Sequence, residues 1–118
     1  MIDQELNGLR LPPHSVEAEQ SVLGGLLLDN GAWERIGDTL AEPDFYVGGH
    51  RQLFAAMRRM FEHGAAVDAV TLAEAMQSQG ELEAVGGLTY LVALANNTPS
   101  AANIRRYAEI VRERAQRR

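Results

Sequence analysis

Apolar side chains recur along most of this chain at the spacing of an α-helix. In the stretch 15–28, four of them follow one another at steps of one and three residues: Val22, Leu23, Leu26 and Leu27. Two prolines precede the stretch and Ser15 can cap its first turn, while Glu17 and Glu19 place negative charge at the positive end of the helix dipole. The pattern predicts a helix from about residue 15 to residue 28 that packs against other helices.

The same periodicity predicts five further helices. A short one spans about 33–40, a third begins between 44 and 49 and ends at Gly64, and a fourth begins after Asp68 or Thr71 and ends at Gly80. Thr71 and Glu74 fit a capping box for the fourth helix. In the fourth helix, the residues expected to face inward are Leu72, Ala75 and Met76. A fifth helix follows Gly86-Gly87, and its expected inward residues are Leu88, Tyr90, Leu91 and Leu94.

The last predicted helix follows Pro99 and carries one apolar stripe. Its members are Ile104, Tyr107, Ala108, Val111 and Ala115. If this helix folds back onto Leu91 and Leu94 the chain can be a monomer, whereas a splayed helix leaves the stripe for a neighbour to cover. Since no β-branched alternating run is present, we expect an all-α fold, a compact bundle of about five short helices followed by this helix.

Charge is unevenly distributed along the 118 residues. The net charge is −5, with five arginines against fourteen acids in residues 1–100 and six arginines against two acids in residues 101–118. An acidic body repels phosphate backbones, so the arginine-rich C-terminal helix is the candidate for binding single-stranded DNA. The spacings Arg105–Glu109 and Glu113–Arg117 instead favour ion pairs on a solvated helix face.

Several kinds of chemistry find no support in the sequence. The chain has no cysteine, and it has no lysine for a nucleotide-binding phosphate loop. His14, His50 and His63 lack a metal-ligand spacing, and no serine lies in a nucleophile elbow. We therefore expect no catalytic residue, metal site or cofactor, and no membrane segment. The paired glycines at 24–25 indicate close approach of another helix.

Two blocks carry a resemblance to a known family. Residues 12–29 and residues 97–115 resemble the N-terminal (collar) domain of the bacterial DnaB-type replicative DNA helicases. Between these blocks, further matching pieces fall in the family's order: Asp44-Phe45-Tyr46, His50, Leu53-Phe54, Val67-Asp68, Val70-Thr71, Leu82, Gly86-Gly87 and Tyr90-Leu91. Their order and spacing together make the resemblance specific.

The resemblance implies an interaction and oligomerisation module and not an enzyme. It divides the chain into a flexible arm (1–11), a helical head (12–98) and the start of a truncated dimerisation hairpin (99–118), with the ATPase domain, its ATP and its magnesium expected outside this sequence. It implies primase binding through Glu17 and Tyr90. Dimerisation is implied for Ile104, Tyr107, Val111 and Ala115.

The partners implied by the resemblance are primase, the other helicase subunits of a homodimer within a hexamer, and a helicase loader. DNA would be bound only by the full-length ring, and the expected location is the bacterial cytoplasm at the nucleoid. The alternative function is a helical domain that binds single-stranded DNA through its C-terminal arginines.

Overall fold

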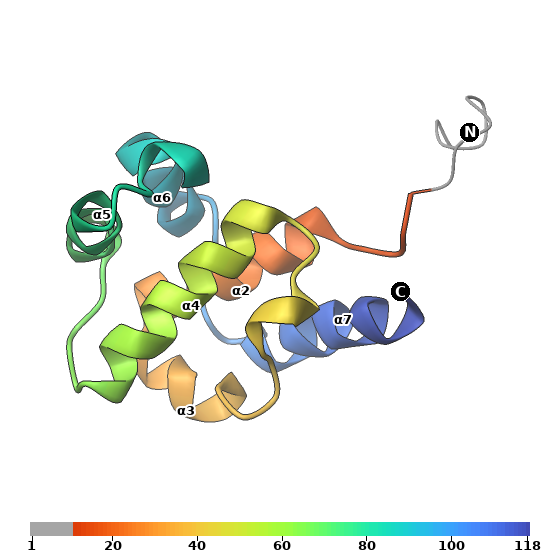
Figure 1. The fold of residues 1–118 in the computed structure, drawn as a ribbon. Coiled ribbons are helices and arrows are strands. Elements are labelled where there is room, and N and C mark those ends of the chain that lie inside the picture. Colours follow the sequence, from red (N-terminus) through yellow and green to blue (C-terminus); the bar gives the residue numbers. More distant parts are fainter. Residues whose placement is uncertain (1–10) are drawn as a thin grey trace.

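The computed structural model describes residues 11–118, which form six α-helices joined by short 3-10 turns and contain no strand. The bounds are α2 Val16–Leu28, α3 Trp33–Ile36, α4 Gly48–Glu62, α5 Ala69–Ser78, α6 Gly87–Asn96 and α7 Ile104–Arg117, with 3-10 turns η1 Asn30–Ala32, η2 Glu42–Asp44 and η3 Glu83–Val85. In Figure 1, α4 crosses α2, α5 and α6 lie together at one end, and α7 runs to the opposite end. The expected all-α fold is confirmed.

Local sequence signals set the bounds of the first helix. The Ser15 backbone is extended, and its hydroxyl accepts a hydrogen bond from the amide of Ala18 at 3.2 Å. After Leu28, the Asp29 carboxylate accepts from the amide of Gly31, and the Asn30 amide group bonds to the backbone of Val67. The helix therefore starts and stops where the sequence predicts.

Helix α2 is the centre of the core and packs against α4, α6 and α7. Val22, Leu23 and Leu26 on it are fully buried. A Cβ placed at Gly24 would collide with the backbone oxygen of Leu94 and the side chain of Thr98. The predicted close approach at this glycine is thus confirmed, and the approaching segment is the end of α6.

Several element boundaries differ from the sequence prediction. Helix α3 ends at Ile36, four residues earlier than expected, and the last helix begins at Ile104, five residues after Pro99. The cap of α5 is Asp68, whose carboxylate accepts from the Thr71 amide at 2.8 Å, so the capping box with Glu74 is wrong. Two inward predictions are also wrong, since Ala75 is only half-buried and Leu88 is 45% exposed.

Helix α7 folds back onto the head, where it packs mainly against α2, with further contacts to α3 and the η2 turn. Its residues Ile104, Ala108 and Val111 are buried in the core. The predicted pairs Arg105–Glu109 and Glu113–Arg117 do not form among the described residues. Arg106 pairs with Glu109 and Glu113 instead, and other α7 arginines bind the head.

Two arginines fasten the C-terminal end of α7 to the segment around η2. The Arg112 guanidinium donates to the Asp44 carboxylate at 3.0 Å. Arg118 donates to the backbone oxygens of Asp44 and Pro13, each at 2.8 Å. These contacts fix the direction of α7 relative to the head. Of the predicted arm 1–11, residues 1–10 lie outside the described part of the chain.

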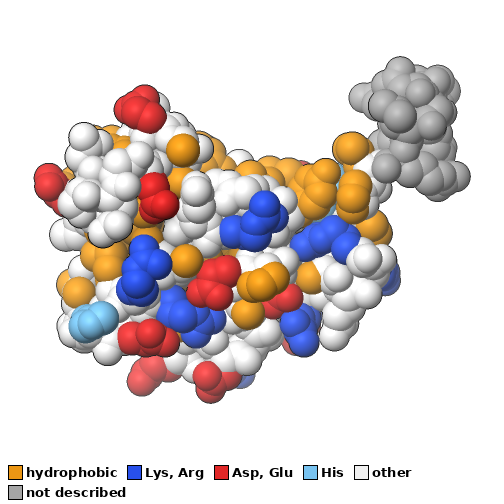
Figure 2. Space-filling view, in the orientation of Figure 1, with side chains coloured by type: hydrophobic (Ala, Val, Ile, Leu, Met, Phe, Trp, Pro, Cys, Tyr) orange, Lys and Arg blue, Asp and Glu red, His pale blue; other side chains and the backbone are white. Residues whose placement is uncertain are grey.

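Basic side chains are confined to part of the visible face. Figure 2 shows arginine side chains over α4 and toward the C-terminal end, with acidic side chains among them and along the lower edge, while the end formed by α5 and α6 shows acidic side chains and no basic one. The sequence accounts for this, because no arginine or lysine lies between Arg59 and Arg105.

Candidate protein-docking site

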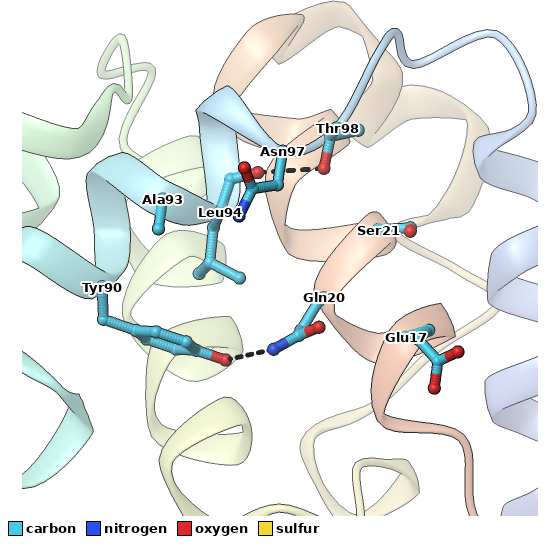
Figure 3. Close-up of a pocket in the computed structure, with 8 residues that line it drawn as sticks. All are labelled: Glu17, Gln20, Ser21, Tyr90, Ala93, Leu94, Asn97 and Thr98. Atoms are coloured by element: carbon cyan, nitrogen blue, oxygen red, sulfur yellow. Dashed lines mark hydrogen bonds between the residues drawn. The ribbon is translucent and has the colours of Figure 1, made fainter.

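A pocket of about 180 Å³ lies between α2 and α6. Its lining comes from these two helices and the turn after α6: Glu17, Gln20, Ser21, Tyr90, Ala93, Leu94, Asn97 and Thr98. In Figure 3, Tyr90 extends from α6 toward Gln20, and Glu17 lies one turn earlier on α2. The structure therefore brings together the two residues for which the resemblance implies partner binding, although they are far apart in sequence.

Tyr90 is held in the wall of this pocket by a chain of hydrogen bonds. Its hydroxyl accepts from the Gln20 side-chain amide at 3.1 Å and lies 2.6 Å from Nε2 of His50. The other ring nitrogen of His50, Nδ1, lies 2.8 Å from the Glu19 carboxylate. With the proton of His50 on Nδ1, each side chain donates a hydrogen bond to the next one, from Gln20 through Tyr90 and His50 to Glu19.

Glu19 is the buried end of this hydrogen-bond chain. Only 1% of the residue is exposed, and its carboxylate also accepts from the backbone amides of Tyr46 and Val47, at 2.7 and 3.3 Å. Glu19 lies in the first turn of α2, where the sequence interpretation places its charge, but its burial and its contacts with Tyr46, Val47 and His50 were not predicted. Its carboxylate ties α2 to the start of α4, and through His50 to α6.

The backbone before α6 shapes the other side of Tyr90. Gly86 has φ = +113°, a left-handed conformation that L side chains rarely adopt, and a Cβ there would lie 2.7 Å from the Cβ of Tyr90. The tyrosine ring also stacks on the His50 ring, at 5.9 Å between centroids and 6° between planes. Gly86 and His50 together fix where the ring of Tyr90 can lie.

The lining of the pocket combines apolar surface with a few polar groups and one negative charge. Glu17 is exposed, and within residues 11–118 its carboxylate makes no salt bridge. The amides of Gln20 and Asn97 and the hydroxyl of Ser21 lie on the same lining. This arrangement offers hydrogen-bond acceptors and one uncompensated charge, which suits recognition of a partner's side chain and offers no reactive nucleophile.

Sequence reasoning missed most of this lining. Gln20, Ser21 and Asn97 were not recognised as candidates, although the first two lie three and four residues after Glu17 and so share its side of a helix. That helical spacing was the available signal. Asn97 could not have been found in this way, because it lies in the turn after α6, far from Glu17 in the sequence.

The residues expected to dimerise lie elsewhere, along α7. Ile104 and Val111 are 0% and 1% exposed against the core, whereas Tyr107 and Ala115 are half-buried. Of the two alternatives that the sequence leaves open, the folded-back helix is the one observed for Ile104 and Val111, since the core of this chain covers them. Their role in dimerisation stays a prediction.

Residues 11–118 show neither a metal-binding cluster nor a membrane-spanning helix. Histidine, aspartate and glutamate side chains form no group of three able to hold a metal ion within residues 11–118. In that range, no helix combines the length and the apolar character needed to cross a lipid bilayer. The pocket between α2 and α6 is the candidate site for recognition because it brings Glu17 and Tyr90 together.

Comparison with known proteins identifies the family. The family model described as the DnaB-like helicase N terminal domain matches residues 11–113. The chain belongs to this family. A crystal structure of the N-terminal domain of DnaB helicase from Mycobacterium tuberculosis is similar, with a TM-score of 0.89 and 40% identity, over 92% of this chain and 75% of that one.

Curated relatives and a second structure agree with this membership. The replicative DNA helicases DnaB of Haemophilus influenzae and Geobacillus stearothermophilus are 44% and 42% identical over 96% and 94% of this chain. A structure titled as a DnaB-like replicative helicase and its interactions with primase has a TM-score of 0.76 and 26% identity, over 86% of this chain and 24% of that one.

The DnaB-like chain spans about a quarter of the length of these curated relatives. It corresponds to the N-terminal domain of a replicative helicase, which does not include the ATPase domain. The sequence of this DnaB N-terminal domain contains no lysine and hence no phosphate-binding loop of its own.

Proposed function

We propose that this DnaB-like domain docks primase during DNA replication through the pocket between α2 and α6. The observation that carries the proposal is that Glu17 and Tyr90, from separate helices, line one pocket whose tyrosine is fixed by a hydrogen-bond chain that ends at the buried Glu19. A rigid aromatic residue with a polar tip beside a carboxylate that makes no ion pair within residues 11–118 is typical of a specific docking site. The similar helicase whose printed title names interactions with primase supports this choice of partner.

The test is binding of the C-terminal domain of primase from the same organism, measured by calorimetry. We expect Glu17→Ala to weaken binding by about tenfold, or ~1.4 kcal/mol, with unchanged circular dichroism. The matched control is Glu34→Ala, since Glu34 is an exposed carboxylate on α3 outside the pocket.

A second variant, Tyr90→Ala, is expected to weaken binding by at least as much. It also removes a hydrogen-bond partner from the buried His50, so its unfolding curve must be recorded beside the affinity. Wild-type affinity in both Glu17→Ala and Tyr90→Ala, or unfolding of both, would remove the proposal.

The second part of the proposed function is assembly of the helicase collar. In this proposal the segment 99–118 belongs to a helical hairpin that pairs subunits in a homodimer within a hexamer, using Tyr107 and Ala115 on the part of α7 that is not fully covered. The contacts of Arg112 and Arg118 with the segment around η2 support a fixed direction for this hairpin. A helicase loader is a further proposed partner, and the proposed location is the cytoplasm. ATP and magnesium would be bound by the ATPase domain of the full helicase.

Binding of single-stranded DNA by α7 is the weaker candidate. Arg106, Arg112 and Arg118 are already engaged within the chain, which lowers the charge available for phosphates. Fluorescence anisotropy with a labelled oligonucleotide at low salt is expected to stay flat. A rise that disappears steeply with salt would favour the DNA-binding function instead.

A further inference from the structure

We propose that the pocket between α2 and α6 receives a guanidinium group, the side chain of an arginine on the docking partner. This inference rests on the proposed docking function and names the chemical group that enters the pocket. It is carried by a carboxylate that is unpaired within residues 11–118, by neutral acceptors beside it, and by an aromatic wall of fixed position.

Charge is the first argument. The lining of the pocket contains one ionised group, Glu17, and no cation. No arginine or lysine is present in the sequence between residues 60 and 104, so α5 and α6 supply none to the neighbourhood. Within residues 11–118 the Glu17 carboxylate makes no ion pair, so it is free to compensate a positive charge brought by a partner.

The direction of the neighbouring hydrogen bonds is the second argument. One N–H of the Gln20 side-chain amide donates to the Tyr90 hydroxyl, so the nitrogen is turned toward Tyr90. Its oxygen consequently remains as an acceptor, and Figure 3 shows this oxygen on the side of Glu17. The Ser21 hydroxyl lies on the next residue of the same wall. A guanidinium carries five N–H donors and no acceptor, so it can donate to the carboxylate and to these oxygens at once.

The aromatic wall distinguishes a guanidinium from an ammonium. Tyr90 lines the pocket, and the His50 ring and Gly86 restrict its position. A planar guanidinium stacks on a tyrosine face while its edge faces a carboxylate, whereas an ammonium is a compact point charge. The volume of about 180 Å³ equals that of about six water molecules, which is ample for the four heavy atoms of a guanidinium.

The test uses the chain itself and two matched probes. N-acetyl-arginine methylamide and N-acetyl-citrulline methylamide differ by a charged guanidinium against a neutral urea of nearly the same shape. Each is titrated into the ¹⁵N-labelled chain and followed by heteronuclear NMR. We expect the arginine probe to shift the backbone amides of Gln20, Ser21 and Asn97, and the citrulline probe to bind at least about fivefold more weakly.

Variants of the chain assign the effect to the carboxylate. Glu17→Gln keeps the shape of the side chain and removes its charge, and we expect it to weaken the arginine probe by about fivefold, to the level of the citrulline probe. Glu34→Gln, an exposed carboxylate outside the pocket, is the control and is expected to leave the titration unchanged. Equal binding of the two probes, shifts confined to other parts of the chain, or unchanged binding to Glu17→Gln would each overturn the inference.

A second arm separates this inference from the proposed function. The C-terminal domain of primase is titrated into the same labelled chain, and its exposed arginines are replaced by glutamine one at a time. One replacement is expected to reproduce the loss seen with Glu17→Gln, and to lose nothing further when combined with it. If the primase domain does not bind, the proposed partner is wrong, while the guanidinium preference is still decided by the small probes. If primase binds and no arginine replacement matters, the inference is wrong and the proposed function stands.

Discussion

Replacement of Glu19 by alanine tests whether the buried carboxylate organises the fold. The substitution removes the acceptor used by three donors: the amides of Tyr46 and Val47 and Nδ1 of His50, at 2.7, 3.3 and 2.8 Å. A buried donor left without an acceptor costs about 1–3 kcal/mol. Since Tyr46 and Val47 are half-buried and water can reach their amides, we expect a total loss of about 3–5 kcal/mol.

This loss is large on the scale of the whole molecule. A domain of this size has a free energy of unfolding of roughly 6–18 kcal/mol, so Glu19→Ala should leave a folded but much weakened protein. The measurement is urea unfolding followed by circular dichroism at 222 nm. With a slope of ~2 kcal/mol/M, the expected change moves the midpoint down by about 1.5–2.5 M.

Two further variants make the result interpretable. Glu19→Gln keeps one acceptor oxygen in the same place and is expected to lose only about 1–3 kcal/mol. Glu17→Ala removes an exposed carboxylate from the same turn of α2 and should stay within about 0.5 kcal/mol of the wild type. If Glu19→Ala also stays within about 0.5 kcal/mol at an unchanged slope, the carboxylate is not the anchor that its hydrogen bonds indicate.

Three other predictions follow from the packing and the caps. Gly24→Ala should lower the free energy of unfolding by more than about 2 kcal/mol, because the added Cβ meets the backbone of Leu94. If urea unfolding gives the same loss of stability for Gly24→Ala and Gly25→Ala, this reasoning is contradicted. The backbone amide of Thr71 lowers the pKa of the Asp68 carboxyl below its ordinary value. The cap therefore stabilises α5 fully at a pH above the ordinary pKa, and this stabilisation is lost as the pH falls through the lowered pKa. Asp68→Asn should remove this pH dependence of stability in thermal unfolding between about pH 5 and pH 2. Light scattering should find a monomer at micromolar concentration, and a dimer that persists on dilution to nanomolar would contradict this. Ile104→Glu should unfold the chain, since Ile104 is buried.

The sequence by itself predicted the elements whose signals are local. Ser15 caps α2, and Gly64 and Gly80, both at positive φ, follow α4 and α5, because capping and left-handed turns involve residues within four positions of one another. Periodicity also identified much of the core, including Leu72 and Leu91. The family followed from two blocks of residues whose order is specific.

Tertiary structure decided what depends on how the helices are rotated against one another. Glu19 and Glu17 look alike in the sequence, yet one is buried and the other lines an open pocket. Likewise, Arg112 has a near neighbour of opposite charge in sequence, but its partner is Asp44, 68 residues away. The spacing of residues along the sequence determines which side of its own helix a residue occupies. Which other helix faces that side is determined only by the packing of the whole core, and the pocket that joins Glu17 to Tyr90 is a product of that packing.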